Sequence, residues 1–286
     1  MAVLASLLWL PGCSLNPATD APSETLPGVE LVTPTEPATV AIVNGEGIPG
    51  DIYNASLGRF IAAQNQTGTL LATDNPQTAV LNDLIDRLLL AQAAREAGFN
   101  LTDQVLDERV ARIIEEAGGQ EAFGQWTVAH GYTMETFREE LRLEIEAAWM
   151  REHIVSDVPT NAEQVLAQQV LLNESFQAER LLEQLEGGTP FEQIVVNNDP
   201  QRLGTLGWFP RGYLLQKEVE DVAFSLQPGE YSDVVETELG FHIIEVLDRD
   251  PDRHLNPQAL LALQLKTLED WLNERREQAA IEIFIQ

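Results

Sequence analysis

Side chains that commonly carry chemistry are few in this sequence and widely spaced. It has one cysteine, Cys13, and four histidines: His130, His153, His242 and His254. No H-E-x-x-H pair or comparable ligand spacing joins the histidines, so no metal site is expected. A single cysteine cannot form an intramolecular disulfide or a cysteine-based metal cluster. The chemistry of this chain must therefore rest on polar and apolar side chains that the fold brings together.

Residues 161 to 250 alternate short strands with helical stretches. VLAQQVLL is typical of a buried strand, and SFQAERLLEQLEGG of an amphipathic helix that ends at two glycines. TPFEQIVV, GTLGWFPRG and a short helix around KEVEDVAFSL follow. VVET and GFHIIEV read as two strands joined at a tight Glu238-Leu239-Gly240 turn. This order predicts an α+β domain with helices packed on a small antiparallel or mixed sheet.

The segments of this region, in this order, resemble the parvulin-type (PpiC, or rotamase) family of peptidyl-prolyl isomerases. The resemblance covers about ninety residues, and we assign the domain to residues 159–250. It is carried by Gly204, Leu206-Gly207-Trp208-Phe209, Arg211-Gly212, Glu220-Asp221 with Ala223-Phe224, Pro228-Gly229-Glu230, Thr237, and Gly240-Phe241-His242-Ile243-Ile244.

The resemblance implies catalysis of X-Pro amide rotation. The barrier to this rotation is about 18–20 kcal/mol, and uncatalysed exchange takes tens to hundreds of seconds. A site can lower the barrier by holding the proline ring in an apolar socket and favouring the twisted amide. Each ~1.36 kcal/mol of such differential stabilisation speeds exchange about tenfold. No covalent bond breaks, so no cofactor is implied.

Matching motif to motif predicts an apolar pocket that binds the substrate proline. Its residues are Leu206, Phe209, Leu214 and Val219. Leu214 replaces the usual pocket methionine, a swap that nearly conserves volume. Val219 falls near the usual phenylalanine and makes a smaller socket. The alternative for all four residues is ordinary core, because apolar side chains fill cores and pockets alike.

The polar site departs from the family pattern. His242 and Thr237 match the family's histidine and hydroxyl. The second family histidine should fall at Gln169, and the family's Asp or Cys at Asn197, or at Asp199 if the loop is gapped differently. Glutamine can donate and accept hydrogen bonds but cannot titrate, and asparagine removes a negative charge. The catalytic set of this chain is thus expected to be reduced.

Residues 39–158 show mainly helical periodicity after a strand-and-turn opening, ATVAIVNGEGI. The VAIVNGEGI, LNDLIDRLLLAQAAREAGF and GYTMETFREELR segments resemble the N-terminal chaperone domain of SurA- and PrsA-type foldases. Thr102 and Thr133 are expected N-caps. A further helical run follows residue 254, and the chain ends in AAIEIFIQ. The resemblance implies that residues 255–286 return to complete this domain. One helical face is strongly apolar: Val80, Leu81, Leu84, Ile85, Leu88 and Leu89.

Residues 1–13, MAVLASLLWLPGC, read as an export signal. Leu10-Pro11-Gly12-Cys13 resembles a bacterial lipobox, which predicts lipidation of Cys13 and anchoring to the cell membrane. Residues 14–38 are rich in Pro, Thr, Ser and Glu and lack aromatics, so a disordered linker is expected. The protein is thus predicted to be extracytoplasmic.

The formal net charge is -29, from 46 acidic and 17 basic residues. So negative a chain repels phosphate backbones, which argues against nucleic-acid partners. The leading hypothesis is an isomerase and foldase whose partners are unfolded or nascent exported polypeptides with X-Pro bonds. The alternative is a non-catalytic parvulin-fold chaperone that holds such segments. An acidic envelope scaffold is a third reading.

Overall fold

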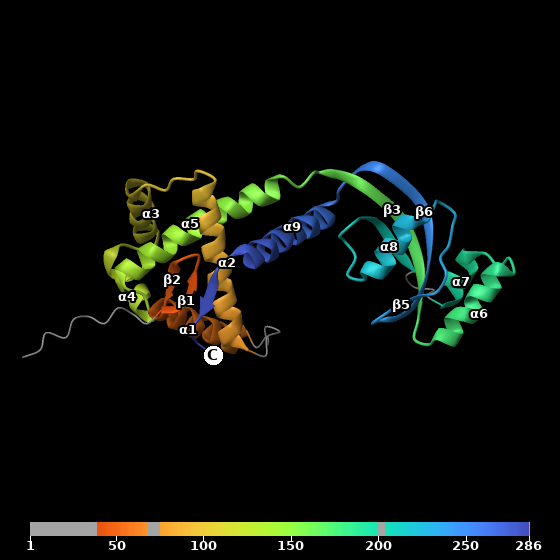
Figure 1. The fold of residues 1–286 in the computed structure, drawn as a ribbon, viewed down its shortest axis with the longest axis horizontal. Coiled ribbons are helices and arrows are strands. Elements are labelled where there is room, and N and C mark those ends of the chain that lie inside the picture. The colour runs from red at the N-terminus through yellow and green to blue at the C-terminus, as the bar shows by residue number, and fades with distance from the viewer. Residues whose placement is uncertain (1–38, 68–74, 199–203, 286) are drawn as a thin grey trace, which may run out of the picture. The chain divides into compact units, whose positions relative to one another are not determined.

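A computed structural model describes residues 39–67, 75–198 and 204–285 and contains two separate β-sheets, each with its own helices (Figure 1). The expected signal peptide, Cys13, the linker 14–38 and Asp199 lie outside the described residues. None of the described helices is both long and apolar enough to span a membrane.

The first sheet has the strand order β2-β1-β7 and joins residues from distant parts of the chain. It comprises β1 (Thr39–Val43), β2 (Glu46–Pro49) and β7 (Ile281–Ile283). β1 and β2 form a hairpin whose turn residues, Asn44 (φ 53°) and Gly45 (φ 86°), both lie in the left-handed region. Asn-Gly suits such a two-residue turn, because both residues tolerate positive φ. On its other side β1 pairs antiparallel with β7.

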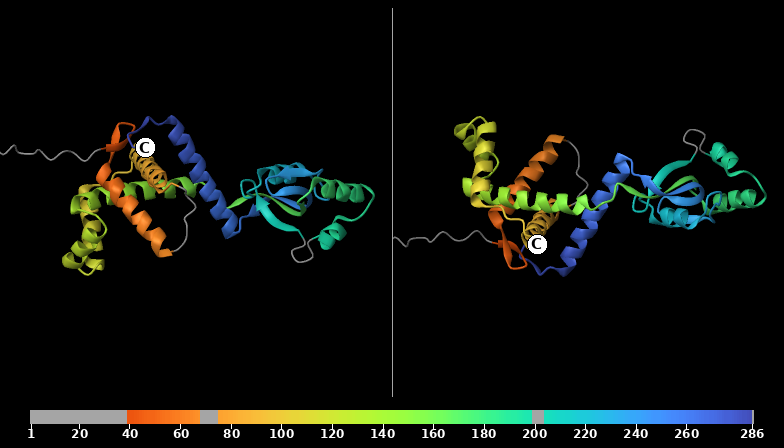
Figure 2. Two further views of the ribbon diagram at one scale, coloured as in Figure 1. Left: turned by 90° about the horizontal axis from the view of Figure 1, so that it is seen from below. Right: turned by 90° about the horizontal axis from the view of Figure 1, so that it is seen from above.

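Six helices accompany the first sheet in the described residues (Figure 2). The N-caps predicted at Thr102 and Thr133 are confirmed, since each side chain accepts a hydrogen bond from a backbone N–H of the helix that follows. The first and the fourth of these helices were not foreseen. The fourth begins after Gly119 without a side-chain cap. The six are α1 (Gly50–Thr67), α2 (Pro76–Glu96), α3 (Asp103–Glu116), α4 (Gln120–Ala129), α5 (Met134–Ser156) and α9 (Pro257–Gln278).

Helix α2 is the centre of the core beside this sheet. Its predicted apolar face is buried against β1, β2 and the start of α1. Each fully buried leucine contributes about 1.5–3 kcal/mol relative to an exposed one. Further along, Leu90, Ala93 and Ala94 pack with α5 and with the Trp271 side of α9.

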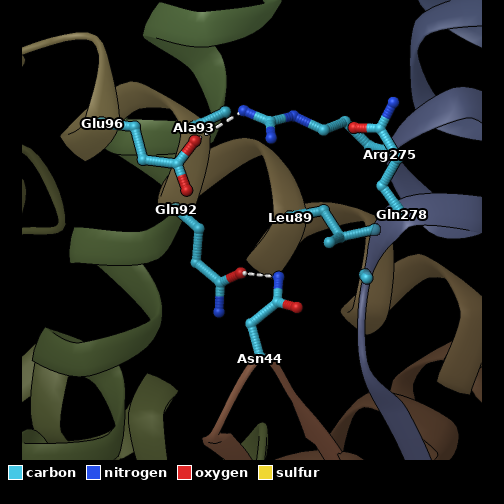
Figure 3. A pocket seen from close by; sticks show the side chains of 8 residues that line it. Asn44, Leu89, Gln92, Ala93, Glu96, Arg275 and Gln278 are labelled. Carbon is cyan, nitrogen blue, oxygen red and sulfur yellow. Dashed lines mark hydrogen bonds and ion pairs between the residues drawn. The ribbon is translucent and has the colours of Figure 1, made fainter.

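Polar contacts also tie the later part of the chain to α2 (Figure 3). The Arg275 guanidinium of α9 lies 2.6 Å from the Glu96 carboxylate. The Asn44 amide of the β1–β2 turn donates to Gln92 at 2.9 Å. Asn44 also receives a hydrogen bond from the backbone N–H of Ala280, which fixes the entry of β7.

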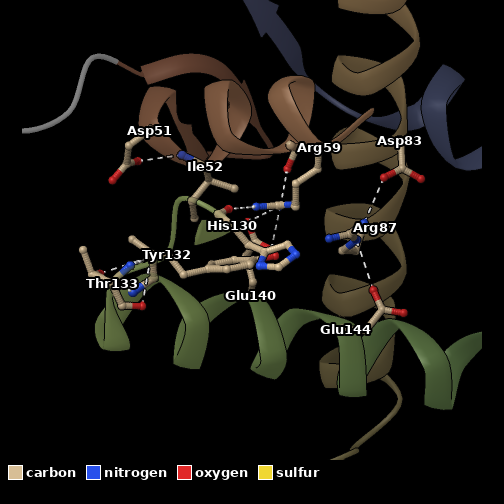
Figure 4. A network of polar contacts seen from close by, with 12 residues as sticks. Asp51, Ile52, Arg59, Asp83, Arg87, His130, Tyr132, Thr133, Glu140 and Glu144 are labelled. Carbon is tan, nitrogen blue, oxygen red and sulfur yellow. Dashed lines mark hydrogen bonds and ion pairs between the residues drawn. The ribbon is translucent and has the colours of Figure 1, made fainter. Parts of the chain in front are cut away.

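A second network ties α1 to α5 (Figure 4). Glu140 of α5 is buried, with 8% exposure, and both its oxygens accept from the Arg59 guanidinium at 3.3 Å. The Tyr132 hydroxyl donates to the same carboxylate at 2.9 Å. Burial and the neighbouring Glu140 charge raise the pKa of Tyr132 to about 12, so this hydroxyl keeps its proton at neutral pH.

The second sheet has the order β4-β3-β6-β5 and every neighbouring pair is antiparallel, which confirms the predicted α+β fold class. Helix α8 (Lys217–Ser225) packs on one face. Helices α6 (Ser175–Glu186) and α7 (Phe191–Asn198) pack on the other. The strands are β3 (Asn161–Leu172), β4 (Thr205–Pro210), β5 (Val235–Thr237) and β6 (Gly240–His254).

β6 is longer than the predicted GFHIIEV strand. It continues to His254 because β3 begins at Asn161 and pairs with it along its whole length, across two irregularities in register. Beside one of these, the buried Gln164 side chain donates to the carbonyls of Arg253 and His254. The polar stretch after Val246 is held in the sheet by this backbone pairing.

Candidate functional site

Three of the predicted site residues meet on one face of the second sheet. His242 of β6 lies directly opposite Leu171 of β3 and Val235 of β5. Side chains two positions apart on a strand point to the same face. Gln169 and Thr237 therefore flank His242 from the two neighbouring strands.

Hydrogen bonds join these three side chains into a chain with a defined direction. His242 Nδ1 lies 2.8 Å from Gln169 Oε1, an oxygen that can only accept, so Nδ1 carries the proton. His242 Nε2 lies 2.8 Å from Thr237 Oγ1 and accepts from the hydroxyl. The backbone N–H of Leu239 donates to that same hydroxyl oxygen at 3.1 Å.

The imidazole of His242 is buried, with 1% exposure. Burial lowers its pKa below the usual 6.5, and the negative charge of Glu218 on α8 partly opposes this by favouring the charged form. A neutral ring with its proton on Nδ1 agrees with both hydrogen bonds. Sequence spacing does not indicate that Glu218 acts on His242, because the two lie on different elements.

Position 240, in the turn between β5 and β6, must be a glycine for the site to form. Gly240 has φ +132°, and a Cβ at this position would lie 2.4 Å from the Leu172 carbonyl oxygen. Any side chain would push the β5–β6 turn away from β3. Since Thr237 and His242 stand on either side of this turn, Gly240 sets the distance between them.

The four predicted pocket residues gather in one apolar cluster under α8. Phe209 and Val219 are almost fully enclosed, with 0% and 2% exposure, whereas Leu206 and Leu214 are only partly buried at the edge of the cluster. The enclosed pair therefore lies inside the cluster, and the other two reach the surface. His242 lies on the same sheet face as this cluster, because the cluster members Ile244 and Val246 follow it at every second position along β6.

Asn197 is not part of the polar network. It lies on the exposed side of α7, whose buried residues pack against the sheet face opposite to His242. None of the hydrogen bonds found in the described residues joins Asn197 to His242, Thr237 or Gln169. The motif match therefore brings three polar positions together and leaves this one apart.

Leu215 is an exposed apolar residue that the sequence analysis did not single out. It follows Leu214 in the segment between β4 and α8 and is 95% exposed. Water contact with so much apolar surface is unfavourable, and a ligand could cover it. The signal in the sequence was the doubled leucine just before a helix.

Comparison with known proteins agrees with this arrangement. Residues 153–248 match the model of the PPIC-type PPIASE domain, and residues 25–151 match the model of the SurA-like N-terminal domain. The chain thus joins a region similar to the SurA-like N-terminal domain to a region similar to the PPIC-type PPIASE domain. The end of β6, helix α9 and strand β7 lie after the two matched regions.

Individual relatives are similar over most of the chain at low identity. The foldase protein PrsA of Geobacillus kaustophilus is 27% identical over 191 residues, covering 62% of this chain and 64% of the relative. The chaperone SurA of Nitrosospira multiformis is 26% identical over 250 residues, covering 73% of this chain and 56% of the relative. The match thus spans less than two thirds of either relative. A crystal structure of peptidylprolyl isomerase PrsA from Bacillus cereus aligns with a TM-score of 0.43 and 17% identity, covering 85% of this chain and 87% of that one.

Proposed function

We propose that this chain is a peptidyl-prolyl cis-trans isomerase and foldase that acts on exported polypeptides outside the cytoplasmic membrane. The observation that carries the proposal is the bonded set His242, Thr237 and Gln169 on the same sheet face as an apolar cluster. Leu206 and Leu214 bring that cluster to the surface. A proline ring suits the apolar edge, and its preceding carbonyl suits the polar set.

The proposed mechanism uses positioning and hydrogen bonding alone. Rotation of the X-Pro amide loses resonance, and its carbonyl and nitrogen change their hydrogen-bonding character on the way. The Gln169 oxygen is engaged by His242, so its amide nitrogen keeps N–H donors that can face a substrate carbonyl. His242 holds both neighbours in register and does not need to transfer a proton. Stabilising the twisted amide by about 4 kcal/mol would accelerate exchange roughly a thousandfold.

The test is the cis/trans exchange rate of a short X-Pro peptide, measured by NMR with the full chain. We expect clear acceleration that falls at least about tenfold in His242→Ala, since two hydrogen bonds of the set are lost. His254→Ala is the matched control, because it removes an exposed histidine from the same strand. Unchanged acceleration in His242→Ala would overturn the assignment.

A second candidate function is holding without catalysis, and two observations favour it. Gln169 stands where the family carries a titrating histidine, and the enclosed Val219 offers a proline ring less apolar surface than the phenylalanine usual in the family. Peptide binding without acceleration in the wild-type chain would establish this reading. If Gln169→His then introduced acceleration, the missing histidine would account for the loss.

For the chain as a whole we propose a helical chaperone domain of residues 39–158 completed by 255–286, and an isomerase domain of residues 159–250. The pairing of β7 with β1 and the packing of α9 on α2 and α5 support the discontinuous assignment. Unfolded or nascent exported polypeptides are the proposed partners.

We also propose that Cys13 carries a lipid that anchors the protein to the cell membrane, on the strength of the lipobox-like LPGC. The measurement is fractionation of cells that express the wild type or Cys13→Ser. Release of the variant from the membrane fraction is expected, and equal membrane association of both would refute the anchor.

A further inference from the structure

Glu220 is a buried carboxylate beside the proposed pocket whose role the reaction itself does not explain. It lies in the first turns of α8, next to Val219, and is 6% exposed. Its carboxylate accepts hydrogen bonds from three consecutive backbone N–H groups of the segment before the helix. Gly212 donates at 2.7 Å to Oε1, and Tyr213 and Leu214 donate at 3.0 Å and 3.1 Å to Oε2.

Three converging N–H groups are the backbone arrangement that binds anions in proteins. Here the anion is the chain's own side chain. Gly212 enters the segment at φ +84°, a left-handed conformation that lets successive N–H groups turn to one side. Burying a carboxylate is unfavourable unless it is hydrogen-bonded, and bonds to a charged acceptor are about twice as strong as neutral ones. The position of residues 212–214 is therefore set mainly by Glu220.

The segment held in this way carries Leu214, one of the proposed socket residues, and Leu215 directly after it. Leu214 packs at the edge of the apolar cluster, and Leu215 follows it with 95% exposure. Without a fixed backbone, two adjacent leucines would turn inward to escape water. The carboxylate instead holds the first against the cluster and leaves the second outside.

We propose that Glu220 is a positioning residue for substrate: it fixes the backbone of residues 212–214 so that Leu214 and Leu215 face the proline-containing segment. The inference rests on the proposed function in that the ligand is an X-Pro peptide. Glu220 touches no reacting atom. It acts through the two leucines, so its loss weakens binding and leaves the rate of the bound complex almost unchanged.

The test compares Glu220→Gln with the wild type in the full chain. The amide that this substitution introduces offers one acceptor oxygen and places its own N–H donors against backbone N–H groups. Asp221→Asn is the matched control, because it removes one negative charge from the same helix at an exposed position paired with Lys217. Glu220→Asp is the second variant, which keeps the charge but is one methylene too short to reach all three donors.

Three quantities are measured by NMR: amide hydrogen exchange of residues 212–214, the Kd of an X-Pro peptide, and the exchange rate at saturating peptide. In Glu220→Gln we expect faster amide exchange and a Kd raised about tenfold, the effect of losing roughly one charge-assisted hydrogen bond. The saturated rate should stay within about threefold, because transition-state contacts are retained. Glu220→Asp should show a smaller rise in Kd, and Asp221→Asn none.

An unchanged Kd alongside faster amide exchange would overturn the proposal, since the segment would then be held for stability alone. The proposal would also be overturned if both Glu220 variants lost the folded state and, with it, both affinity and saturated rate. If only Glu220→Gln fails to fold, Glu220→Asp decides. Should the wild type bind peptide without accelerating exchange, the isomerase function fails while Kd and amide exchange still test Glu220.

Discussion

At the scale of single residues, the imidazole of His242 has one hydrogen-bond donor and one acceptor, and both are used. Gln169 fixes the donor on Nδ1, and Thr237 supplies the proton that Nε2 accepts. A second histidine at position 169 could exchange its proton with the first. A glutamine cannot, so a single tautomer of His242 is held at all pH values where the ring is neutral.

This environment predicts the pH dependence of His242. Burial lowers its folded-state pKa below 6.5, while unfolding restores the usual value. Between those two values the unfolded chain binds more protons, so stability falls as the pH is lowered through that window and is constant above it. The slope from this group is at most about 1.4 kcal/mol per pH unit.

NMR titration of the imidazole signals measures the effect directly. The His242 signal should titrate below pH 6.5. In His242→Gln the loss of stability between about pH 7 and 5.5 should be smaller than in the wild type, as measured by urea unfolding. A His242 midpoint above 6.5 would contradict the buried, neutral ring.

The candidate site was predicted from the order of the motifs in the sequence. His242, Thr237 and Gln169 were each placed by resemblance, and the sheet register brings them together. Asn197 was placed by the same reasoning and lies apart, because it is on the exposed side of α7, which packs on the sheet face opposite to His242. The contribution of Glu218 depends on how α8 packs on the sheet, which no local pattern in the sequence contains.

At the scale of elements, predictions succeeded where local chemistry is decisive. The apolar face of α2, the threonine caps of α3 and α5 and the Asn-Gly turn all follow from short-range rules. Helices α1 and α4 were not predicted from the sequence, because tertiary contacts stabilise them. For α1 these include the Arg59–Glu140 ion pair with α5, a residue pair 81 positions apart in the sequence.

The Arg59–Glu140–Tyr132 network gives a prediction for element packing. Removing the carboxylate in Glu140→Ala leaves a largely buried guanidinium and a tyrosine hydroxyl without their acceptor. We expect a loss of about 3 kcal/mol in the free energy of unfolding, the usual effect of breaking a buried ion pair. Urea denaturation followed by tryptophan fluorescence measures it.

Glu139→Ala is the control for this change, since Glu139 is the exposed neighbour on the same helix. It should alter the free energy of unfolding by less than about 0.5 kcal/mol. Equal effects of the two substitutions would mean that the network contributes no more than a surface charge does.

At the scale of the whole molecule, the first sheet depends on residues 281–283. β7 covers the open side of β1, and the backbone contacts Asn44 N–Ala280 O and Phe284 N–Val40 O extend the pairing at both ends. No pattern in the sequence before residue 254 indicates that β1 pairs with this strand. The family resemblance suggested a returning segment without its register.

Truncation after Ala280 tests the importance of this pairing. Several backbone hydrogen bonds and the cover over Val40 and Val43 are lost, so unfolding of the first sheet and its helices should become easier by about 2 kcal/mol. Amide exchange of β1 should rise sharply, while exchange in β3 and β6 stays unchanged. Glu282→Ala, which keeps the strand, should behave like the wild type, and unaltered β1 exchange in the truncated chain would contradict the prediction.

The pairing of β1 with β7 also affects the order in which the two sheets can form during synthesis. Asn44 and Ala280 are 236 positions apart in the sequence, whereas the strands β3 to β6 are contiguous in it. As the chain emerges, the second sheet has all its strands once His254 is made, before β7 begins at Ile281. Closing so long a loop costs less entropy once the intervening residues are folded and compact. Until then β1 has an unpaired edge that other chains can join. At that stage the chain exposes the same kind of unpaired strand edge as an unfolded polypeptide.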